Sequence, residues 1–318
     1  MSRPLVIQAE DLSPPAVEFL RQHCELLACP AHDPRFAPAL REARGLVVRT
    51  YTRVDAAMLA GAPNLKVVGR AGVGLDNIDV DACRARGITV VSTPNANTQD
   101  VAENVFALLL DALRPRRLVD HALPLEQWNA LRRSLLAPRQ LSQMTLGVWG
   151  LGKIGSRVAT IAGAIGMRVL YHDLLDIPPE KRANATCVPR ERLLRESDIV
   201  SIHVDARAEN RHLVGDEALA LLRSDAVLLN TSRGFVVDAH ALARFLRANP
   251  RAMAILDVHD PEPFPPPPAP QYPLLGLPNA RLSPHIAAAT ALANENMSWV
   301  VRDVVRVLSG ERPEFAAT

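Results

Sequence analysis

Short apolar runs alternate with amphipathic stretches along almost the whole chain, and this alternation constrains the fold more than any other feature. Many of the runs are separated by about 20 residues, which leaves room for one helix between successive runs. Strands that alternate with helices form βαβ units and a parallel sheet. The predicted strands are residues 4–8, 24–29, 45–49, 65–70 and 88–93, followed by residues 145–149, 168–171, 199–203, 226–230, 252–257 and 281–283.

The two series of predicted strands indicate two domains. A chain of 318 residues is long enough for two domains of about 100–200 residues each. We predict an α/β protein with two Rossmann-like, doubly wound parallel-sheet domains and a cofactor and substrate cleft between them. Residues 98–287 are predicted as a domain inserted into the other one, which consists of residues 1–97 and 288–318.

Three other segments have a distinct composition. Residues 98–113 are predicted as one long helix, followed by an arginine-rich connector, residues 116–139, with Trp128 in its middle. Residues 261–273 hold eight of the 26 prolines, which predicts a stiff surface loop, with a docking site for a PxxP-binding partner as the alternative. Residues 291–308 are predicted as a final helix.

Charge and composition exclude several classes of protein. The 36 basic and 34 acidic residues leave a net charge of +2, which gives no electrostatic case for binding nucleic acid or a membrane surface. No run of about 18 apolar residues is present, and the first residues lack the apolar core of a signal peptide. Cys24, Cys29, Cys83 and Cys187 form no CxxC pair and no metal-ligand spacing, so we expect reduced thiols, no metal and a cytoplasmic location.

The most specific motif is Gly150-Leu151-Gly152-Lys153-Ile154-Gly155, a GxGxxG that follows a predicted strand and opens a predicted helix. Gly150 allows a tight turn, Gly152 lets the backbone approach a pyrophosphate, and Gly155 lets the helix pack closely on the strand. The N–H groups at the start of the helix, around Lys153 and Ile154, then bind the phosphates of a dinucleotide. The alternative is that the glycines only tighten a turn between a strand and a helix.

An acidic residue supports the dinucleotide interpretation. Asp173 stands 18 residues after Gly155, at the end of the next predicted strand. An aspartate there accepts hydrogen bonds from the ribose hydroxyls and repels a 2′-phosphate. Leu174 and Leu175, which follow it, offer no cation for such a phosphate. The predicted cofactor is therefore NAD.

Three polar residues lie just after predicted strands of the second series. Arg233 is within Asn230-Thr231-Ser232-Arg233-Gly234, Glu262 comes five residues after Asp257, and His285 follows Ser283-Pro284. The carboxyl ends of parallel strands meet at one edge of a sheet, so these side chains are expected near the nucleotide. A guanidinium can clamp a carboxylate, an imidazole can move a proton near neutral pH, and a carboxylate can orient that imidazole.

Each residue alone has a structural alternative, as a surface ion-pair residue or a loop histidine, but their joint placement favours catalysis. His203 and His259 also follow strands and are predicted to pack or to support other groups.

These motifs resemble those of the D-isomer-specific 2-hydroxyacid dehydrogenase family, and the resemblance extends over nearly the whole chain. It is carried by residues 147–155, 230–234, 256–263 and 283–285. The resemblance implies that Arg233, Glu262 and His285 are the catalytic set, with His285 as the acid–base. It also implies that Asp257 holds the nicotinamide carboxamide, and that the backbone near Val204, Thr231 and Ala287 contacts the cofactor.

Within the family, residues 69–77 are similar to the substrate loop of short-form D-3-phosphoglycerate dehydrogenases. This similarity implies that Gly72, Val73 and Gly74 bind a substrate carboxylate, with Asn97 nearby and Arg49 able to meet a phosphate or carboxylate. It also implies a flavodoxin-like substrate domain in residues 1–97 and 288–318, an NAD-binding domain in residues 98–287, and a homodimer that forms through residues 98–139. Two positions depart from the family pattern, since Asp205 stands where proline is frequent and Ala287-Ala288 where glycine is.

The leading hypothesis is an NAD-dependent enzyme that interconverts a D-2-hydroxy acid and its 2-keto acid, with D-3-phosphoglycerate as the predicted substrate. Glycerate and hydroxypyruvate, glycolate and glyoxylate, or D-lactate are alternative substrates within the same class. An alternative from another class is an NAD-sensing binding protein that resembles the C-terminal-binding-protein corepressors of this family.

Overall fold

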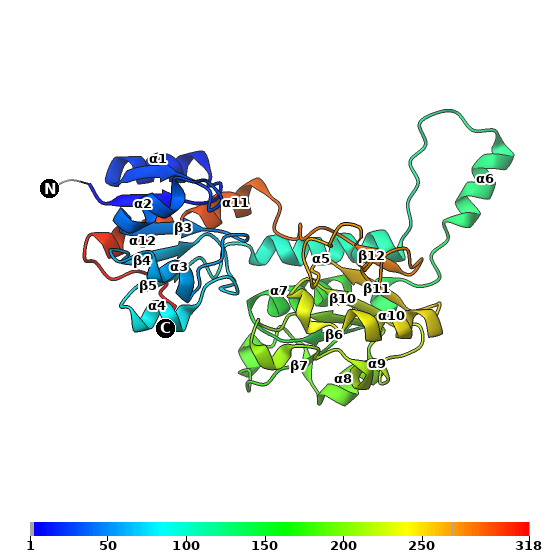
Figure 1. Cartoon of the computed structure of the whole chain (residues 1–318). Coiled ribbons are helices and arrows are strands. Elements are labelled where there is room, and N and C mark those ends of the chain that lie inside the picture. The colour runs from blue at the N-terminus through cyan, green and yellow to red at the C-terminus, as the bar shows by residue number, and fades with distance from the viewer. Residues whose placement is uncertain (1–2, 269, 318) are drawn as a thin grey trace. The chain divides into compact units, whose positions relative to one another are not determined.

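The computed structural model describes residues 3–268 and 270–317 and divides the chain into two compact units. Unit 1 consists of Met1–Asn97 and Ala288–Thr318, and unit 2 of Thr98–Ala287. Figure 1 shows this division by colour, because unit 1 contains the blue and red ends of the chain. No helix of the described residues is both long enough and apolar enough to span a lipid bilayer.

Unit 1 is built on a five-stranded sheet in which every pairing is parallel. Its strand order, 2-1-3-4-5, is that of flavodoxin-like sheets and reverses direction between β1 and β3. The strands are β1 (Leu5–Gln8), β2 (Glu25–Ala28), β3 (Gly45–Val48), β4 (Val67–Arg70) and β5 (Thr89–Ser92).

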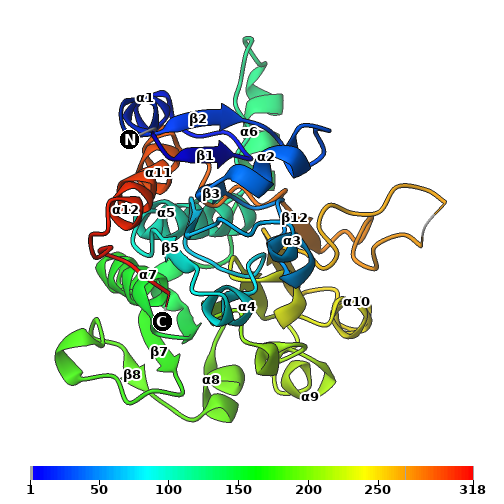
Figure 2. The same cartoon turned by 60° about the vertical axis from the view of Figure 1, so that its left-hand side comes forward.

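Helices cover both faces of this sheet (Figure 2), and each face has its own buried cluster of apolar side chains. Two helices of this unit begin at aspartates, Asp55 and Asp79, whose carboxylates accept from backbone N–H groups three residues later. On one face lie α1 (Pro14–His23) and α12 (Val301–Leu308); on the other lie α2 (Phe36–Glu42), α3 (Ala56–Ala60) and α4 (Val80–Ala85); α11 (Ala291–Ser298) precedes α12.

Unit 2 contains a seven-stranded sheet that is also parallel throughout. The first strand along the chain, β6, lies inside this sheet, with β7 and β8 on one side of it and β9, β10, β11 and β12 on the other. The strand order therefore reverses direction between β6 and β9. In such sheets a ligand binds at this reversal, beyond the carboxyl ends of the strands. The strands are β6 (Thr145–Trp149), β7 (Arg168–His172), β8 (Thr186–Cys187), β9 (Ile199–Ile202), β10 (Val227–Asn230), β11 (Met253–Leu256) and β12 (Ala280–Leu282).

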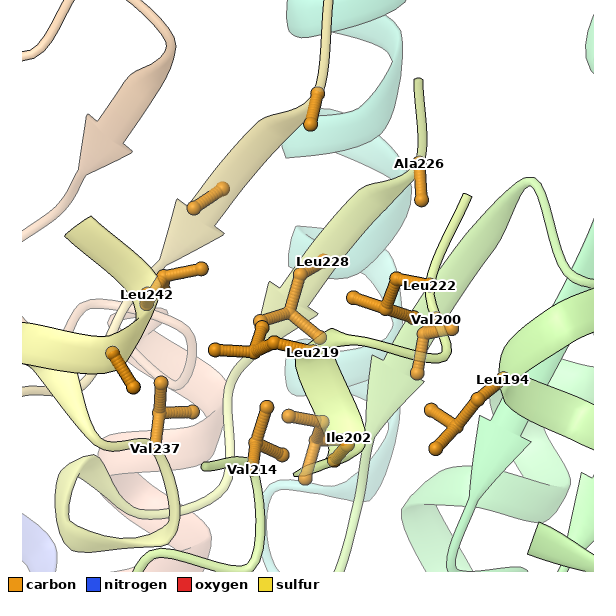
Figure 3. Close-up of a cluster of buried hydrophobic side chains, with 14 of the residues drawn as sticks. Leu194, Val200, Ile202, Val214, Leu219, Leu222, Ala226, Leu228, Val237 and Leu242 are labelled. Carbon is orange, nitrogen blue, oxygen red and sulfur yellow. The ribbon is translucent and has the colours of Figure 1, made fainter. Parts of the chain in front are cut away.

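The strands of unit 2 are apolar on both faces because both faces are covered. On β10, Leu228 packs into the cluster of Figure 3, whereas Val227 and Leu229 pack into the cluster on the opposite face. Successive side chains of a strand point to opposite faces, so a strand buried on both sides reads as a continuous apolar run. The cluster of Figure 3 includes residues of α8 (Arg190–Glu196), α9 (Asp216–Leu219) and α10 (Ala239–Ala248), and the opposite one includes residues of α5 (Thr98–Leu113) and α7 (Lys153–Ile165).

The predicted fold class is confirmed, and all eleven predicted strands are present within two residues of their predicted ends. The prediction missed β8, which has only two residues, and the helix α6 (Leu125–Ser134) within the connector. The predicted helix over residues 291–308 is instead two helices, α11 and α12, which are separated at Trp299 and Val300. Short 3₁₀ helices occur at Leu141–Gln143, Pro179–Lys181, Ala208–Asn210 and Gly234–Val236.

The proline-rich segment after β11, orange at the right of Figure 2, contains neither helix nor strand in its described residues. It is not only a surface loop, however. Tyr272 is 6% exposed and joins the buried cluster of Figure 3, and Phe264 stacks on it with ring centroids 4.6 Å apart. The sequence did not predict this packing, because the prolines dominate the composition of the segment and indicate only a loop.

Candidate active site and dinucleotide pocket

The glycine loop lies between β6 and α7, and two of its glycines are required by the fold itself. Gly150 has a φ of +94°, and a Cβ there would lie 2.7 Å from the carbonyl oxygen of His203. A Cβ on Gly155 would lie 2.0 Å from the carbonyl oxygen of Gly150, so the helix packs on the turn at backbone contact.

Gly152 differs from the other two glycines. It is the residue before the first turn of α7, and a Cβ there would meet no described atom within 4 Å, apart from its own chain neighbours. The fold therefore does not require glycine at this position, whereas a ligand that approaches the backbone closely does. Lys153 and Ile154 form the first turn of α7, whose N–H groups favour an anion.

Asp173 connects the end of β7 to the glycine loop. Its Oδ2 accepts a hydrogen bond from the N–H of Leu151 at 2.7 Å, and its Oδ1 accepts one from the N–H of Leu175 at 2.9 Å. The carboxylate is thus fixed beside the loop where the predicted ribose would bind. Leu174 and Leu175 are 74% and 71% exposed and contribute no charge.

A pocket of about 520 Å³ lies at the reversal of the strand order between β6 and β9. It brings together four residues predicted for the cofactor, Gly150, Gly152, Asp173 and Val204. It also contains Arg190 and Arg207, which the sequence analysis did not assign. The remaining lining residues are Trp149, His172, Leu174, Leu175, Pro189, Glu191, His203, Asp205, Asn210 and Leu213.

The pocket fits the adenosine half of a dinucleotide. It combines a helix N-terminus for phosphate, a fixed carboxylate for ribose hydroxyls and apolar side chains for a base. Burial lowers the pKa of His203 to about 4, so its imidazole is neutral at neutral pH and adds no charge. Its Nε2 lies 2.8 Å from the hydroxyl of Ser201.

The loop after β10 is shaped by Asn230, which is fully buried. Its side chain accepts from the N–H and hydroxyl of Ser232, at 2.9 and 2.7 Å, and donates to the carbonyl of Arg233 at 2.9 Å. The hydroxyl of Thr231, also buried, has no hydrogen-bond partner among the described residues. A buried polar atom of this kind indicates a partner that the chain itself does not supply, as a cofactor would.

Asp257 is fully buried and organises the segment that carries the predicted histidine. Its carboxylate accepts from the Ser283 hydroxyl at 2.5 Å, the N–H of Ile286 at 3.0 Å and the N–H of Ala287 at 2.8 Å. In this structure Asp257 therefore ties the end of β11 to the loop after β12, and the N–H of Ala287 is used inside the protein.

The structure brings Glu262 and His285 together. Nδ1 of His285 lies 2.7 Å from Oε1 of Glu262, and the two side chains are 39% and 29% exposed. Burial raises the pKa of the Glu262 carboxyl, but the hydrogen bond and charge of His285 outweigh it and hold that pKa below its usual value. His285 also has a φ of +56°, which is unusual for a residue other than glycine.

His259 links this pair to the loop of Arg233. Its Nε2 lies 2.8 Å from the carbonyl oxygen of Ser283, and the backbone N–H of His259 donates to Oε2 of Glu262 at 3.4 Å. A Cβ on Gly234 would lie 2.0 Å from the carbonyl oxygen of His259, so the two loops touch at their backbones. The guanidinium of Arg233 donates to the carbonyl of Ser232 at 2.8 Å, beside this contact.

In unit 1, the predicted substrate residues follow β3, β4 and β5. The backbone N–H groups of residues 49–52 all donate to the carboxylate of Glu10, at 2.9–3.2 Å. The guanidinium of Arg49 donates to the carbonyl of Asp11 and to the side chain of Asn294. Sequence reasoning missed Glu10, which lies 39 residues before its first partner.

The loop after β4 contains Gly72, Val73 and Gly74. Gly72 has a φ of +151°, and the guanidinium of Arg70 occupies the space beside its Cα where a Cβ would stand. Val73 and Gly74 are half-buried. Oδ1 of Asn97 is buried without a hydrogen-bond partner in the described part of the chain, as expected of a group that binds a ligand.

Two other observations bear on the chemistry. Among residues 3–268 and 270–317, no three His, Cys, Asp or Glu side chains are arranged to hold a metal ion. Cys24, Cys29 and Cys83 are buried free thiols, and Cys187 is an exposed one.

Comparison with known proteins identifies the family. Residues 106–287 match the family described as D-isomer specific 2-hydroxyacid dehydrogenase, NAD binding domain. The chain is 37% identical, over 98% of its length, to a glyoxylate reductase from Aeropyrum pernix, of which it covers 95%. It is 34% identical, over 96% of its length, to a D-3-phosphoglycerate dehydrogenase from Archaeoglobus fulgidus, and it spans 57% of that longer protein.

A solved structure agrees with these relatives. The D-lactate dehydrogenase of Aquifex aeolicus, complexed with NAD and lactic acid, has a TM-score of 0.81 and 27% identity, with 96% of each chain covered. The three proteins are named for different substrates but for one type of reaction. The chain therefore belongs to the D-isomer specific 2-hydroxyacid dehydrogenase family, and it is an NAD-dependent oxidoreductase.

Proposed function

We propose that the enzyme interconverts a D-2-hydroxy acid and its 2-keto acid, with His285 as the acid–base, Glu262 as its positioning residue and Arg233 as the group that binds the substrate carboxylate. The observation that carries this proposal is the 2.7 Å contact between Nδ1 of His285 and Oε1 of Glu262. It leaves Nε2 of the imidazole for the substrate and provides a negative charge beside the ring when the ring is protonated.

The chemistry needs one proton and one hydride to leave the hydroxy acid. NAD, when bound, supplies the acceptor for the hydride from C2. In the same direction, Nε2 of His285 takes the proton of the 2-hydroxyl, and the C2–O bond becomes a carbonyl. In reduction His285 returns that proton to the oxygen. Glu262 stabilises the protonated ring in both directions, and Arg233 holds the substrate carboxylate through its planar fork.

The residues that hold NAD are those predicted from the glycine loop and from the family resemblance. Gly150, Gly152, Lys153, Ile154 and Gly155 bind the pyrophosphate, and Asp173 binds the adenosine ribose. Val204 and Thr231 also contact the cofactor. Thr231 does so with its buried hydroxyl, which has no partner among the described residues. Asp257 and Ala287 complete the nicotinamide end, with Asp257 also holding its own loop.

The proposed substrate pair is D-3-phosphoglycerate and 3-phosphohydroxypyruvate. The support is the similarity of residues 69–77 to the loop of phosphoglycerate dehydrogenases and the relative of that name. In this proposal the N–H groups of Val73 and Gly74 bind the carboxylate, whereas the N–H of Gly72 donates to the carbonyl of Arg70 at 2.8 Å and shapes the loop. Asn97 binds an oxygen of the substrate, and Arg49 binds the phosphate.

A reductase of glyoxylate or hydroxypyruvate is the second candidate, and one observation favours it. The guanidinium of Arg49 already binds Asp11 and Asn294, and Arg53 lies 3.6 Å from the carboxylate of Asp55. A phosphate would have to compete with these internal partners, whereas a small uncharged side chain on the keto acid would not.

NADH oxidation at 340 nm, measured with four 2-keto acids, separates the candidates. The acids are 3-phosphohydroxypyruvate, hydroxypyruvate, glyoxylate and pyruvate, with His285→Ala as the control that retains NADH binding but loses about 10²–10⁴-fold in kcat. The highest kcat/KM on the phosphorylated acid, reduced selectively by Arg49→Ala, supports the first proposal. A preference for glyoxylate or hydroxypyruvate that Arg49→Ala leaves unchanged supports the second and contradicts the first.

The proposal also includes a homodimer and a cytoplasmic location. The connector of unit 2 exposes several apolar side chains, notably Leu118, Leu125, Trp128 and Leu136, as an interface between copies would require. The free thiols are those of a protein kept in a reducing compartment.

A further inference from the structure

Two arginines enter the dinucleotide pocket from segments that carry no recognised motif. Arg190 is the first residue of α8, and Arg207 follows β9 by five residues. A pocket that binds adenosine next to two guanidinium groups would be expected to accept a ribose 2′-phosphate, since arginine binds phosphate well. The charge of Asp173 alone therefore does not explain why a pocket with two arginines would prefer NAD, which lacks the 2′-phosphate, to NADP.

Each of these arginines is bound to a carboxylate of the same pocket. Arg207 donates to Asp205 through Nε at 2.7 Å and through Nη2 at 2.5 Å, a two-pronged contact. Arg190 lies 3.0 Å from the carboxylate of Glu191. Each guanidinium group therefore already has a carboxylate partner within its own segment.

Asp205 is itself held in place. The side-chain amide of Asn210, a buried residue, donates to Oδ1 of Asp205 at 2.9 Å and to its backbone carbonyl at 2.9 Å. Arg207 and the Asn210 amide hold the pKa of the Asp205 carboxyl below its usual value, so it is ionised at neutral pH. The pocket contains three carboxylates, those of Asp173, Asp205 and Glu191, and two guanidinium groups.

Arg207 lies near enough to Asp173 for the charges to interact. The hydrogen bonds and charge of Asp205 raise the pKa of Arg207, and the charges of Glu209 and Asp173 add to that effect. Arg207 lines the same pocket as Asp173 and is therefore a cation available to a phosphate on the ribose that Asp173 would bind.

We propose that Asp205 is a second determinant of cofactor choice: by binding Arg207 with both oxygens, it withholds that guanidinium from a 2′-phosphate and so favours NAD over NADP. Asp173 discriminates by direct repulsion, whereas Asp205 acts through Arg207 and is in that sense a specificity-determining residue. The inference rests on the assignment of this pocket to the adenosine half of NAD.

The test is a double-mutant cycle of Asp205→Asn and Arg207→Ala, read by cofactor binding. Trp149 lines the pocket, so quenching of tryptophan fluorescence reports occupancy by NADH or NADPH. Asparagine keeps the size of the side chain and the Oδ1 that accepts from Asn210 and from Nε of Arg207, but loses the charge and the oxygen that accepts from Nη2. We expect Asp205→Asn to bind NADPH about three- to tenfold more tightly, because Arg207 is held less strongly and can bind the phosphate, and to bind NADH within about twofold of the wild type.

The Arg207→Ala variant distinguishes two explanations of a gain in NADPH affinity. The gain can come from Arg207 when Asp205 no longer holds it, or only from the removal of a negative charge. In the Arg207→Ala background, Asp205→Asn should leave NADPH affinity nearly unchanged. An equal gain in both backgrounds, or no gain in either while NADH binds normally, overturns the role of Asp205. Competition between adenosine 5′-monophosphate and NADH at the same tryptophan signal supports the assignment of the pocket. Its absence would overturn the assignment and, with it, the inference. Unchanged thermal unfolding shows that each variant is folded.

Discussion

The backbone of His285 is in a conformation that few residues other than glycine adopt, with a φ of +56°. It is kept there by contacts on both sides. Asp257 binds Ser283, Ile286 and Ala287 around it, and Glu262 binds its ring. A conformation of this kind persists only when its surroundings hold it, so the imidazole is positioned by the loop before any substrate is present.

Replacing Glu262 by glutamine tests that positioning through its dependence on pH. Burial raises the pKa of Glu262, but His285 lowers it more, so the folded-state pKa lies below 4.5. Such a carboxylate stabilises the folded protein above its unfolded pKa, and the stabilisation is lost as the pH falls through the lowered value. We expect Glu262→Gln to cost about 1 kcal/mol or less at pH 7, since both side chains are partly exposed, and to cost nothing once the wild-type carboxyl is protonated.

Two measurements check this expectation. Urea unfolding at pH 7 and near pH 4 should show a difference between wild type and variant that shrinks toward the acid side. The pH–rate profile of the variant should differ from that of the wild type, because the negative charge beside the ring is gone. An unmoved profile would remove Glu262 from the mechanism.

At the scale of elements, the turn from β6 to α7 offers a matched pair of glycine substitutions. Gly150→Ala places a Cβ at positive φ and 2.7 Å from the His203 carbonyl, whereas Gly152→Ala meets no described atom within 4 Å beyond its chain neighbours. We expect Gly150→Ala to destabilise unit 2 by at least about 1–2 kcal/mol, the cost of a left-handed backbone for alanine. Gly152→Ala should fold normally and bind NADH about tenfold or more weakly, because its methyl group occupies the approach of the pyrophosphate.

Thermal unfolding and NADH titration of the two variants give the result directly. Normal NADH affinity in Gly152→Ala would show that the pyrophosphate does not approach this glycine.

Elements with a contiguous pattern were predictable from the sequence, and so was the pairing of Glu262 with His285, but other contacts between distant segments were not. The strands read as apolar runs because both faces of each sheet are covered, and the glycine loop has a local signature. Glu10 has no such signature, since its partners are the backbone N–H groups of residues 49–52, which follow a different strand. Arg207 and the aromatic pair Phe264 and Tyr272 have partners in their own loops, but no local pattern predicts that Arg207 lines the pocket or that the pair anchors the proline-rich segment. The break at Trp299 also leaves no trace, because no glycine or proline lies within residues 291–308 to mark it.

At the scale of the whole molecule, each unit has its own pair of buried clusters, whereas the connector of residues 116–139 has few buried side chains. The helix α6 has no buried residue, and Figure 1 shows it at the end of a long excursion from unit 2. Leu118 and Leu136 are 92% and 82% exposed. A helix without buried residues gains little from packing, and isolated helices of this length are marginal in water. The proposed homodimer would supply the contacts that α6 lacks within its own chain.

A double substitution on α6 tests the homodimer. Leu125→Ser with Trp128→Ser removes two apolar side chains that are 75% and 45% exposed, while Leu292→Ser removes one that is 64% exposed on α11 of unit 1. In size-exclusion chromatography with light scattering, we expect the wild type and Leu292→Ser at twice the mass of one chain, and the double variant shifted toward a single chain at low micromolar concentration. A wild type that elutes as a single chain, or a double variant that stays a dimer, would contradict assembly through this helix. A double variant that stays a dimer would mean that removing apolar area from α6 does not weaken association. This is not possible if that area is buried in the interface.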